Sequence, residues 1–179
     1  MGDKEKQKYN RITLKIVMPL LLVCIVVGIW VVKNSNPGLA LEGNLDSDFA
    51  LHVTQELDLE KLKSYGVPII IDFGADSCIP CKEMAPVLKE LNEELQGRAI
   101  VKFVDVWKYK KLAKGYPVNL IPTQIFIDAE GKPYQPQAPE AIQMNLYTLR
   151  ETEEHVFTTH EGSLSKEQLL NILEEMGLA

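Results

Sequence analysis

The sequence predicts an α/β domain that follows an N-terminal membrane-spanning segment. Residues 69–73 are largely apolar and β-branched, which is typical of a buried strand. A small polar turn and then a helical apolar pattern follow directly, with a Cys-x-x-Cys motif where the helix begins. Residues 16–32 contain no charged side chain. The length of 179 residues fits one globular domain with an additional segment.

The composition excludes several classes of protein. The chain is 46% hydrophobic and 25% charged, as in ordinary globular proteins. Its formal net charge of −6 gives no reason to expect nucleic acid as a partner. Three cysteines are too few for a disulfide scaffold. We expect Cys24, inside the apolar run, to be a lipid-facing or packed small residue, and Val23 before it does not fit a lipoprotein signal.

The N-terminal segment has the pattern of a signal-anchor. Residues 1–15 carry five basic and two acidic side chains, and the uncharged run follows them. Extending that run back to Ile12 gives 21 positions, against about 20 residues needed to span a bilayer. Lys15 can reach the interface, and Trp30 suits the opposite one. We therefore predict a basic cytoplasmic tail (1–15), a transmembrane signal-anchor (16–32) and an extracytoplasmic remainder at the cell membrane.

Two alternatives to a retained anchor remain open. Gly38 and Ala40 place small residues at −3 and −1, so a signal peptide cut after Ala40 would release a secreted protein. A buried core helix is the other alternative. In either membrane-targeted case, residues 33–50, which include Asn, Ser, Pro and Gly, are expected to form a linker.

The rest of the chain alternates strand and helix patterns. A helix is expected from Asp58, a good N-cap, to residue 65, and Ser165 with Gln168 forms a capping box for the last helix. Residues 49–53 are compatible with an edge strand. The remaining expected elements are a strand at 69–73, a helix at 80–95, a strand at 99–106, a basic helical stretch at 108–115, a strand at 122–128 and a turn at 129–133.

Residues 134–154 predict an insertion before the last strand. Residues 144–149 alternate like a strand, and residues 150–154 suit a turn that leads to a returning strand at 155–159. We therefore expect an extra hairpin at this edge of the sheet.

The Cys-x-x-Cys motif predicts a redox site. Cys78 and Cys81 stand at the helix start, where unpaired N–H groups and the macrodipole favour a thiolate. Pro80 fits the first helical turn, and the spacing permits a tight, reducible disulfide. Zinc would need further ligands that no second cysteine pair supplies, and a c-type haem would need histidine where Lys82 stands. We expect no metal or cofactor, while a purely structural disulfide remains an alternative.

At these residues the chain resembles the thioredoxin family. The similarity covers about residues 57–128 and resumes near His155. The resemblance implies a thioredoxin-like three-layer fold with a central mixed sheet over residues 51–179, carrying the inserted hairpin and following the N-terminal transmembrane helix. The residues that carry it are Asp72, Phe73, Cys78, Pro80, Cys81, Lys82, Pro86, Ile121, Pro122 and Thr123.

The resemblance also implies catalytic roles. Cys78 would be the exposed nucleophile that attacks a partner disulfide, and Cys81 would resolve the mixed disulfide. Asp72 lies in the buried strand, so its carboxyl should have a raised pKa suited to accepting the Cys81 proton, through water. A satisfied polar residue at a strand end is the alternative for Asp72, and the resemblance favours the base.

Four residues are expected to bind substrate by the same resemblance. Pro122 should be cis and lie against the cysteine pair, with the Ile121 backbone pairing to an extended substrate segment. An ordinary trans-proline at a strand start is the alternative. Ile79 and Pro80, between the cysteines, complete the expected rim.

Three positions depart from the family pattern. Ser77 stands where the family has tryptophan, Ile79 replaces glycine, and Phe103 aligns with the lysine that partners the buried aspartate, while Lys102 should point to the other face. These differences bear on the pKa of Asp72, the redox potential and the choice of partner.

The sequence therefore predicts a membrane-tethered thiol–disulfide oxidoreductase that reduces disulfides of exported proteins. A reductase outside the membrane needs electrons delivered across it, so the resemblance implies a membrane electron-donor protein. An oxidase or isomerase of the same fold is one alternative. Another is a non-catalytic binding module with a structural disulfide and the hairpin as its binding surface.

Overall fold

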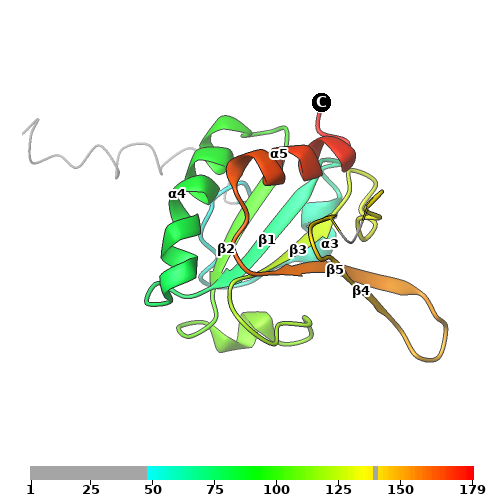
Figure 1. Ribbon diagram of the computed structural model, residues 1–179, viewed down its shortest axis with the longest axis horizontal. Coiled ribbons are helices and arrows are strands. Elements are labelled where there is room, and N and C mark those ends of the chain that lie inside the picture. Colours follow the sequence, from blue (N-terminus) through cyan, green and yellow to red (C-terminus); the bar gives the residue numbers. More distant parts are fainter. Residues whose placement is uncertain (1–47, 139–140) are drawn as a thin grey trace, which may run out of the picture. The chain divides into compact units, whose positions relative to one another are not determined.

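A five-stranded mixed sheet forms the centre of the protein, and its strands follow the order β2-β1-β3-β5-β4 (Figure 1). The computed structural model describes residues 48–138 and 141–179. β1 pairs with β2 in parallel, and every other neighbouring pair is antiparallel, so the predicted mixed sheet is confirmed. The strands are β1 (Ile69–Gly74), β2 (Ile100–Asp105), β3 (Thr123–Ile127), β4 (Asn145–Thr148) and β5 (His155–Glu161).

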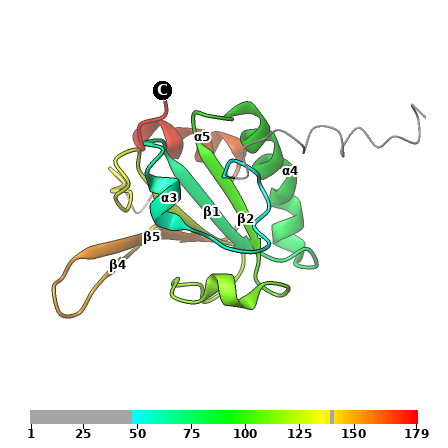
Figure 2. The same ribbon diagram turned by 180° about the vertical axis from the view of Figure 1, so that it is seen from behind.

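Helices cover both faces of this sheet, which gives three layers. α4 (Ile79–Glu94) and α5 (Lys166–Glu175) lie on one face (Figure 1). α3 (Leu59–Lys63) lies on the opposite face (Figure 2). The 3-10 turn η1 (Lys110–Ala113) packs against the same core cluster as α3. The predicted caps form: Asp58 accepts a hydrogen bond from the Lys61 amide at 3.1 Å, and Ser165 closes a capping box.

Alternation along β1 divides the core into two clusters. Ile70 packs with residues of α4 and α5, including Met84 and Leu169. Ile71 and Phe73 point to the other face and pack with residues of α3 and the η1 region. All three β1 side chains are fully buried, as a strand covered on both faces requires.

The basic stretch at 108–115 forms less helix than predicted. It makes only the 3-10 turn η1, and Lys114 already has extended backbone angles. The Tyr116 ring packs against Phe73 and Phe157, with ring centroids 5.0 and 5.7 Å away. Because these contacts draw the chain back to the sheet, the helix ends after one turn. Residues 49–53 likewise form no full strand, only a bridge between His52 and Phe103.

The predicted hairpin is present as β4 and β5, and it extends away from the body of the sheet (Figure 1). The Leu149 amide donates to the Glu154 carbonyl at 2.9 Å, which closes the turn. β5 lies between β3 and β4, so β4 is the edge strand and three of its four residues are exposed.

Among the described residues, no helix is both long and apolar enough to cross a membrane. The predicted tail, transmembrane span and most of the linker, with Cys24, lie outside those residues.

Candidate active site

The two motif cysteines form a disulfide at the N-terminus of α4. Their Cα atoms lie 5.3 Å apart. Cys78 is the N-cap residue, and its Sγ accepts a hydrogen bond from the Cys81 amide at 3.3 Å. That amide is one of the N–H groups that a helix leaves unpaired, and the macrodipole places positive potential at the same point. On reduction, both effects stabilise a Cys78 thiolate.

Cys78, which was expected to be exposed, is largely buried in the disulfide form. It is 8% exposed, and Cys81 is 3% exposed. The reason is packing: Ala75 and Ile121 enclose the pair. Cys78 is still the more accessible of the two. Ile79 next to it is 73% exposed, which places an apolar side chain at the rim of the site.

The loop before β3 forms one wall of the site. The Ile121–Pro122 peptide bond is cis, as predicted. The Ile121 carbonyl oxygen lies 4.0 Å from Cys78 Sγ, and Pro122 is buried. Residues more than 40 positions apart in the sequence are thus brought together around one sulfur.

Asp72 lies buried in β1, with only 1% of its surface exposed. Its Oδ1 accepts a hydrogen bond from Gln124 Nε2 at 2.7 Å, whereas Oδ2 has no hydrogen-bond partner among the residues that the structure describes. Burial raises the pKa of Asp72 from 3.8 to about 7, and the bond from Gln124 opposes this only in part. A carboxyl with that pKa can exchange a proton near neutral pH, as the sequence predicted.

Gly74 is the point at which Asp72 approaches the disulfide. A Cβ atom at Gly74 would lie 3.2 Å from Asp72 Oδ2 and 3.3 Å from Cys81 Sγ. It would also lie 2.8 Å from Cε2 of Phe103, the residue that pairs with Asp72 across β1 and β2. Because glycine has no side chain, the carboxyl, the sulfur and the ring can converge here.

The cation that the family pattern would place beside Asp72 is replaced by an aromatic ring. Phe103 occupies that position, and no cation within residues 48–138 and 141–179 contributes to the pKa shift of Asp72. Lys102 Nζ instead donates to the Ala50 carbonyl at 2.6 Å. The raised pKa therefore results from burial alone.

Two polar residues of this region were not predicted from the sequence. Gln124 positions the Asp72 carboxyl, and a polar residue within the apolar run of β3 was the available signal. Asp105 accepts hydrogen bonds from the backbone amides of Asp76, Trp107 and Lys108 at 2.9–3.1 Å. It thereby ties the loop after β2 to the loop that precedes Cys78, a long-range role that local pattern does not reveal.

The described residues contain no group of three or more His, Cys, Asp or Glu side chains arranged to hold a metal ion. The chemistry of the site is that of two sulfurs, the buried Asp72 carboxyl and the backbone amides around them.

Comparison with known proteins shows similarity to thioredoxins. Residues 50–147 match the thioredoxin family. Thioredoxin 1 of Chlorobaculum tepidum is 35% identical over 98 residues, covering 50% of this chain and 96% of that protein. The chloroplastic thioredoxin Y of Oryza sativa subsp. japonica is 38% identical over 74 residues, covering 41% of this chain and 44% of that protein.

A solved structure of a mutant thioredoxin from Halobacterium salinarum NRC-1 is 25% identical, with a TM-score of 0.49. The match covers 73% of this chain and 94% of that one.

The fold and the site define a redox protein in which a helix-capping disulfide stands at the end of a buried strand. The chain belongs to the thioredoxin family. Its cysteine pair supports thiol–disulfide oxidoreductase activity.

Proposed function

We propose that this protein is a membrane-tethered thiol–disulfide reductase of exported proteins. The observation that carries the proposal is the Cys78–Cys81 disulfide, which lies at the N-terminus of α4 and close to Asp72 Oδ2, an oxygen without a partner in the described part of the chain. This arrangement provides a nucleophile stabilised by the helix, a second thiol within bonding distance and a proton acceptor.

Reduction of a substrate disulfide proceeds in two exchanges. In the dithiol form, the Cys78 thiolate attacks one substrate sulfur, the substrate S–S bond breaks, and the other substrate sulfur leaves as a thiolate. The mixed disulfide joins Cys78 to the substrate. Cys81, as its thiolate, then attacks Cys78 Sγ and displaces the second substrate sulfur. Two electrons pass to the substrate, and the Cys78–Cys81 disulfide forms.

Asp72 assists the second exchange. The Cys81 thiol must lose its proton before it attacks, and Cys81 is almost fully buried. A Cβ atom at Gly74 would lie 3.2 Å from Asp72 Oδ2 and 3.3 Å from Cys81 Sγ, so the carboxyl and the thiol face the same small space. With its pKa near 7, the carboxylate accepts the Cys81 proton, directly or through one water molecule.

The uncharged run at 16–32, behind a basic tail, supports a single-pass anchor with the redox domain outside the cytoplasm. A reductase there must be recharged, so we propose a membrane protein with an exposed dithiol as its electron donor. Protease treatment of intact cells and of spheroplasts tests the topology. Protection of residues 46–179 in spheroplasts would refute export, and a free protein beginning after Ala40 would replace the anchor with a cleaved signal peptide.

The reduction potential of the cysteine pair tests the direction of electron flow. A value near −270 mV is expected for a reductase, whereas a value near −120 mV would indicate an oxidase. Equilibration of the chain with glutathione or dithiothreitol redox buffers gives this number.

Substitution of the nucleophile tests the catalytic assignment. Cys78→Ser should abolish insulin reduction, because the serine hydroxyl cannot form the mixed disulfide. Full activity of that variant would show that the disulfide is structural and that the protein acts as a binding module.

A further inference from the structure

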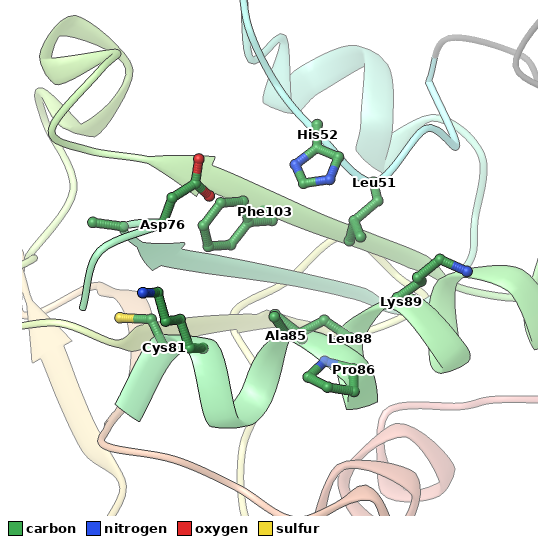
Figure 3. A pocket seen from close by; sticks show the side chains of 11 residues that line it. Leu51, His52, Asp76, Cys81, Ala85, Pro86, Leu88, Lys89 and Phe103 are labelled. Atoms are coloured by element: carbon green, nitrogen blue, oxygen red, sulfur yellow. The ribbon is translucent and has the colours of Figure 1, made fainter. Parts of the chain in front are cut away.

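A pocket of about 410 Å³ opens beside the Cys81 sulfur (Figure 3). The first turns of α4 form one wall, with Ala85 and Leu88 among its side chains. Leu51 and His52 lie on the opposite side, and the Phe103 ring lies between them and the helix (Figure 3). The pocket is thus adjacent to the reactive pair, on the side of Cys81 where the helix runs toward Pro86.

The interior of the pocket is apolar and held in shape by packing. Leu88 and Phe103 are 1% and 7% exposed, and both belong to the main core cluster. The His52 ring lies edge-on to Phe103, with centroids 5.6 Å apart. Such a surface binds an aliphatic or aromatic group without rearranging.

The mouth of the pocket carries a positive charge. Asp76, on the rim, is neutralised by an ion pair with Lys108. Lys89 pairs with Glu93 at 2.5 Å. Lys82, by contrast, is exposed and has no ion pair within residues 48–138 and 141–179. A carboxylate close to a bound apolar group is therefore favoured here.

We propose that this pocket binds an apolar side chain of the polypeptide whose disulfide is being exchanged, with an acidic residue of that polypeptide near Lys82. The inference rests on the proposed function and adds a specificity site to it. The Cα atoms of Cys78 and Cys81 are 5.3 Å apart, and an extended peptide advances about 3.3 Å per residue. Cys81, which is bonded to Cys78, lines the pocket, so we assign the pocket to a side chain about two residues from the attacked cysteine.

The openness of the site favours a polypeptide over a small molecule. Six of the lining residues are exposed, namely His52, Asp76, Lys82, Ala85, Pro86 and Lys89. Small-molecule sites usually enclose most of their ligand, whereas an open pocket suits a single side chain presented by a chain lying across the surface.

The test uses peptides that differ at one position. Disulfide-linked homodimers of a short acidic peptide would carry either Leu or Ser two residues before or two residues after the cysteine. The full-length chain, reduced and freed of reductant, is mixed with each peptide, and the single-turnover rate constant is measured from the released peptide thiol. The Ala85→Leu variant fills the pocket, and Ala141→Leu adds the same atoms at an exposed position outside it.

We expect the Leu peptide to react about tenfold faster than the Ser peptide at one of the two positions, because burial of one aliphatic side chain is worth about that factor. The preference should disappear in Ala85→Leu and persist in Ala141→Leu. All three proteins should reduce 2-hydroxyethyl disulfide at equal rates. Equal rates for the Leu and Ser peptides, or a preference that survives in Ala85→Leu, would overturn the inference. If the unaltered chain failed to reduce 2-hydroxyethyl disulfide, the proposed reductase function would be refuted, and this inference with it.

Discussion

Asp72 and Asp105 stand near the carboxyl ends of two neighbouring parallel strands, yet their carboxyl groups behave in opposite ways. Both are buried, with 1% and 5% of their surface exposed. In the β1–β2 register, Asp72 pairs with Phe103, and Gly74 pairs with Asp105. The pKa of Asp72 is raised to about 7, whereas the pKa of Asp105 is lowered.

The number of hydrogen-bond donors explains the difference. Burial raises the pKa of both groups, but Asp105 accepts three backbone N–H bonds and lies near Lys108, which together outweigh that effect. Asp72 accepts one bond, from Gln124. Burial by itself thus makes a carboxyl that exchanges protons near neutral pH, and amide donors convert it into a fixed anion that holds loops in place.

Removing the Asp72 charge should have the largest effect on stability. A carboxyl whose pKa is about 7 when folded and 3.8 when unfolded binds its proton more tightly in the folded state. Its ionisation therefore destabilises the fold increasingly as the pH rises from about 4 to about 7, by a total of about 4 kcal/mol.

The Asp72→Asn variant lacks this ionisation. The free energy of unfolding of this variant, relative to that of the unaltered protein, should rise by about 4 kcal/mol between pH 4 and pH 8. Urea unfolding of the oxidised proteins at both pH values measures the difference. A difference that stays constant with pH would show that Asp72 titrates normally.

Removing the Asp105 acceptor should have the next largest effect. Asp105→Ala leaves three backbone amides without their partner and should lower the free energy of unfolding by about 3 kcal/mol at pH 7. Because the pKa of Asp105 is lowered, its contribution is present at neutral pH and is lost on acidification, opposite to Asp72. Asp105→Asn, which keeps one acceptor oxygen, should retain part of the stability. A loss below about 1 kcal/mol for the alanine variant would contradict the anchoring role.

Adding a methyl group at Gly74, which lies opposite Asp105, should have a smaller effect. The new Cβ would lie 2.8 Å from the Phe103 ring, so Gly74→Ala should destabilise the fold by about 2 kcal/mol. A second substitution, Phe103→Leu, removes the closest atom and should restore part of that loss. Thermal or urea unfolding of the single and double variants checks this, and the absence of any rescue would place the strain elsewhere.

The smallest effect is expected from Lys108→Ala. Lys108 is exposed and pairs with Asp76, and it lies 3.8 Å from Asp105. Solvent screens such pairs, so the variant should be far less destabilised than Asp105→Ala. The pKa of Asp105 should rise slightly and remain below its ordinary value, because the amide donors persist. Carboxyl ¹³C NMR titration measures this, and a return of Asp105 to an ordinary pKa would assign the shift to Lys108 instead.

Most elements of the domain followed from local sequence signals. The buried strand at 69–73, the helix after the cysteines and the capping box at Ser165 depend on neighbouring residues, so periodicity and capping chemistry were sufficient to predict them. The shortened stretch at 108–115 did not follow, because the packing of Tyr116 against distant rings ends it.

The reactive pair could be predicted from the sequence, because two cysteines three residues apart at a helix start can close a disulfide. It also indicated the buried carboxyl and the cis-proline loop. The tertiary structure was needed to show that Gln124 is the sole hydrogen-bond partner of the Asp72 carboxyl within the described residues, and that Phe103 lies beside Gly74. It likewise decided that a pocket opens next to Cys81. These features could not be predicted from the sequence, because the pKa of a buried group and the shape of a pocket depend on atoms brought together from separate strands and helices.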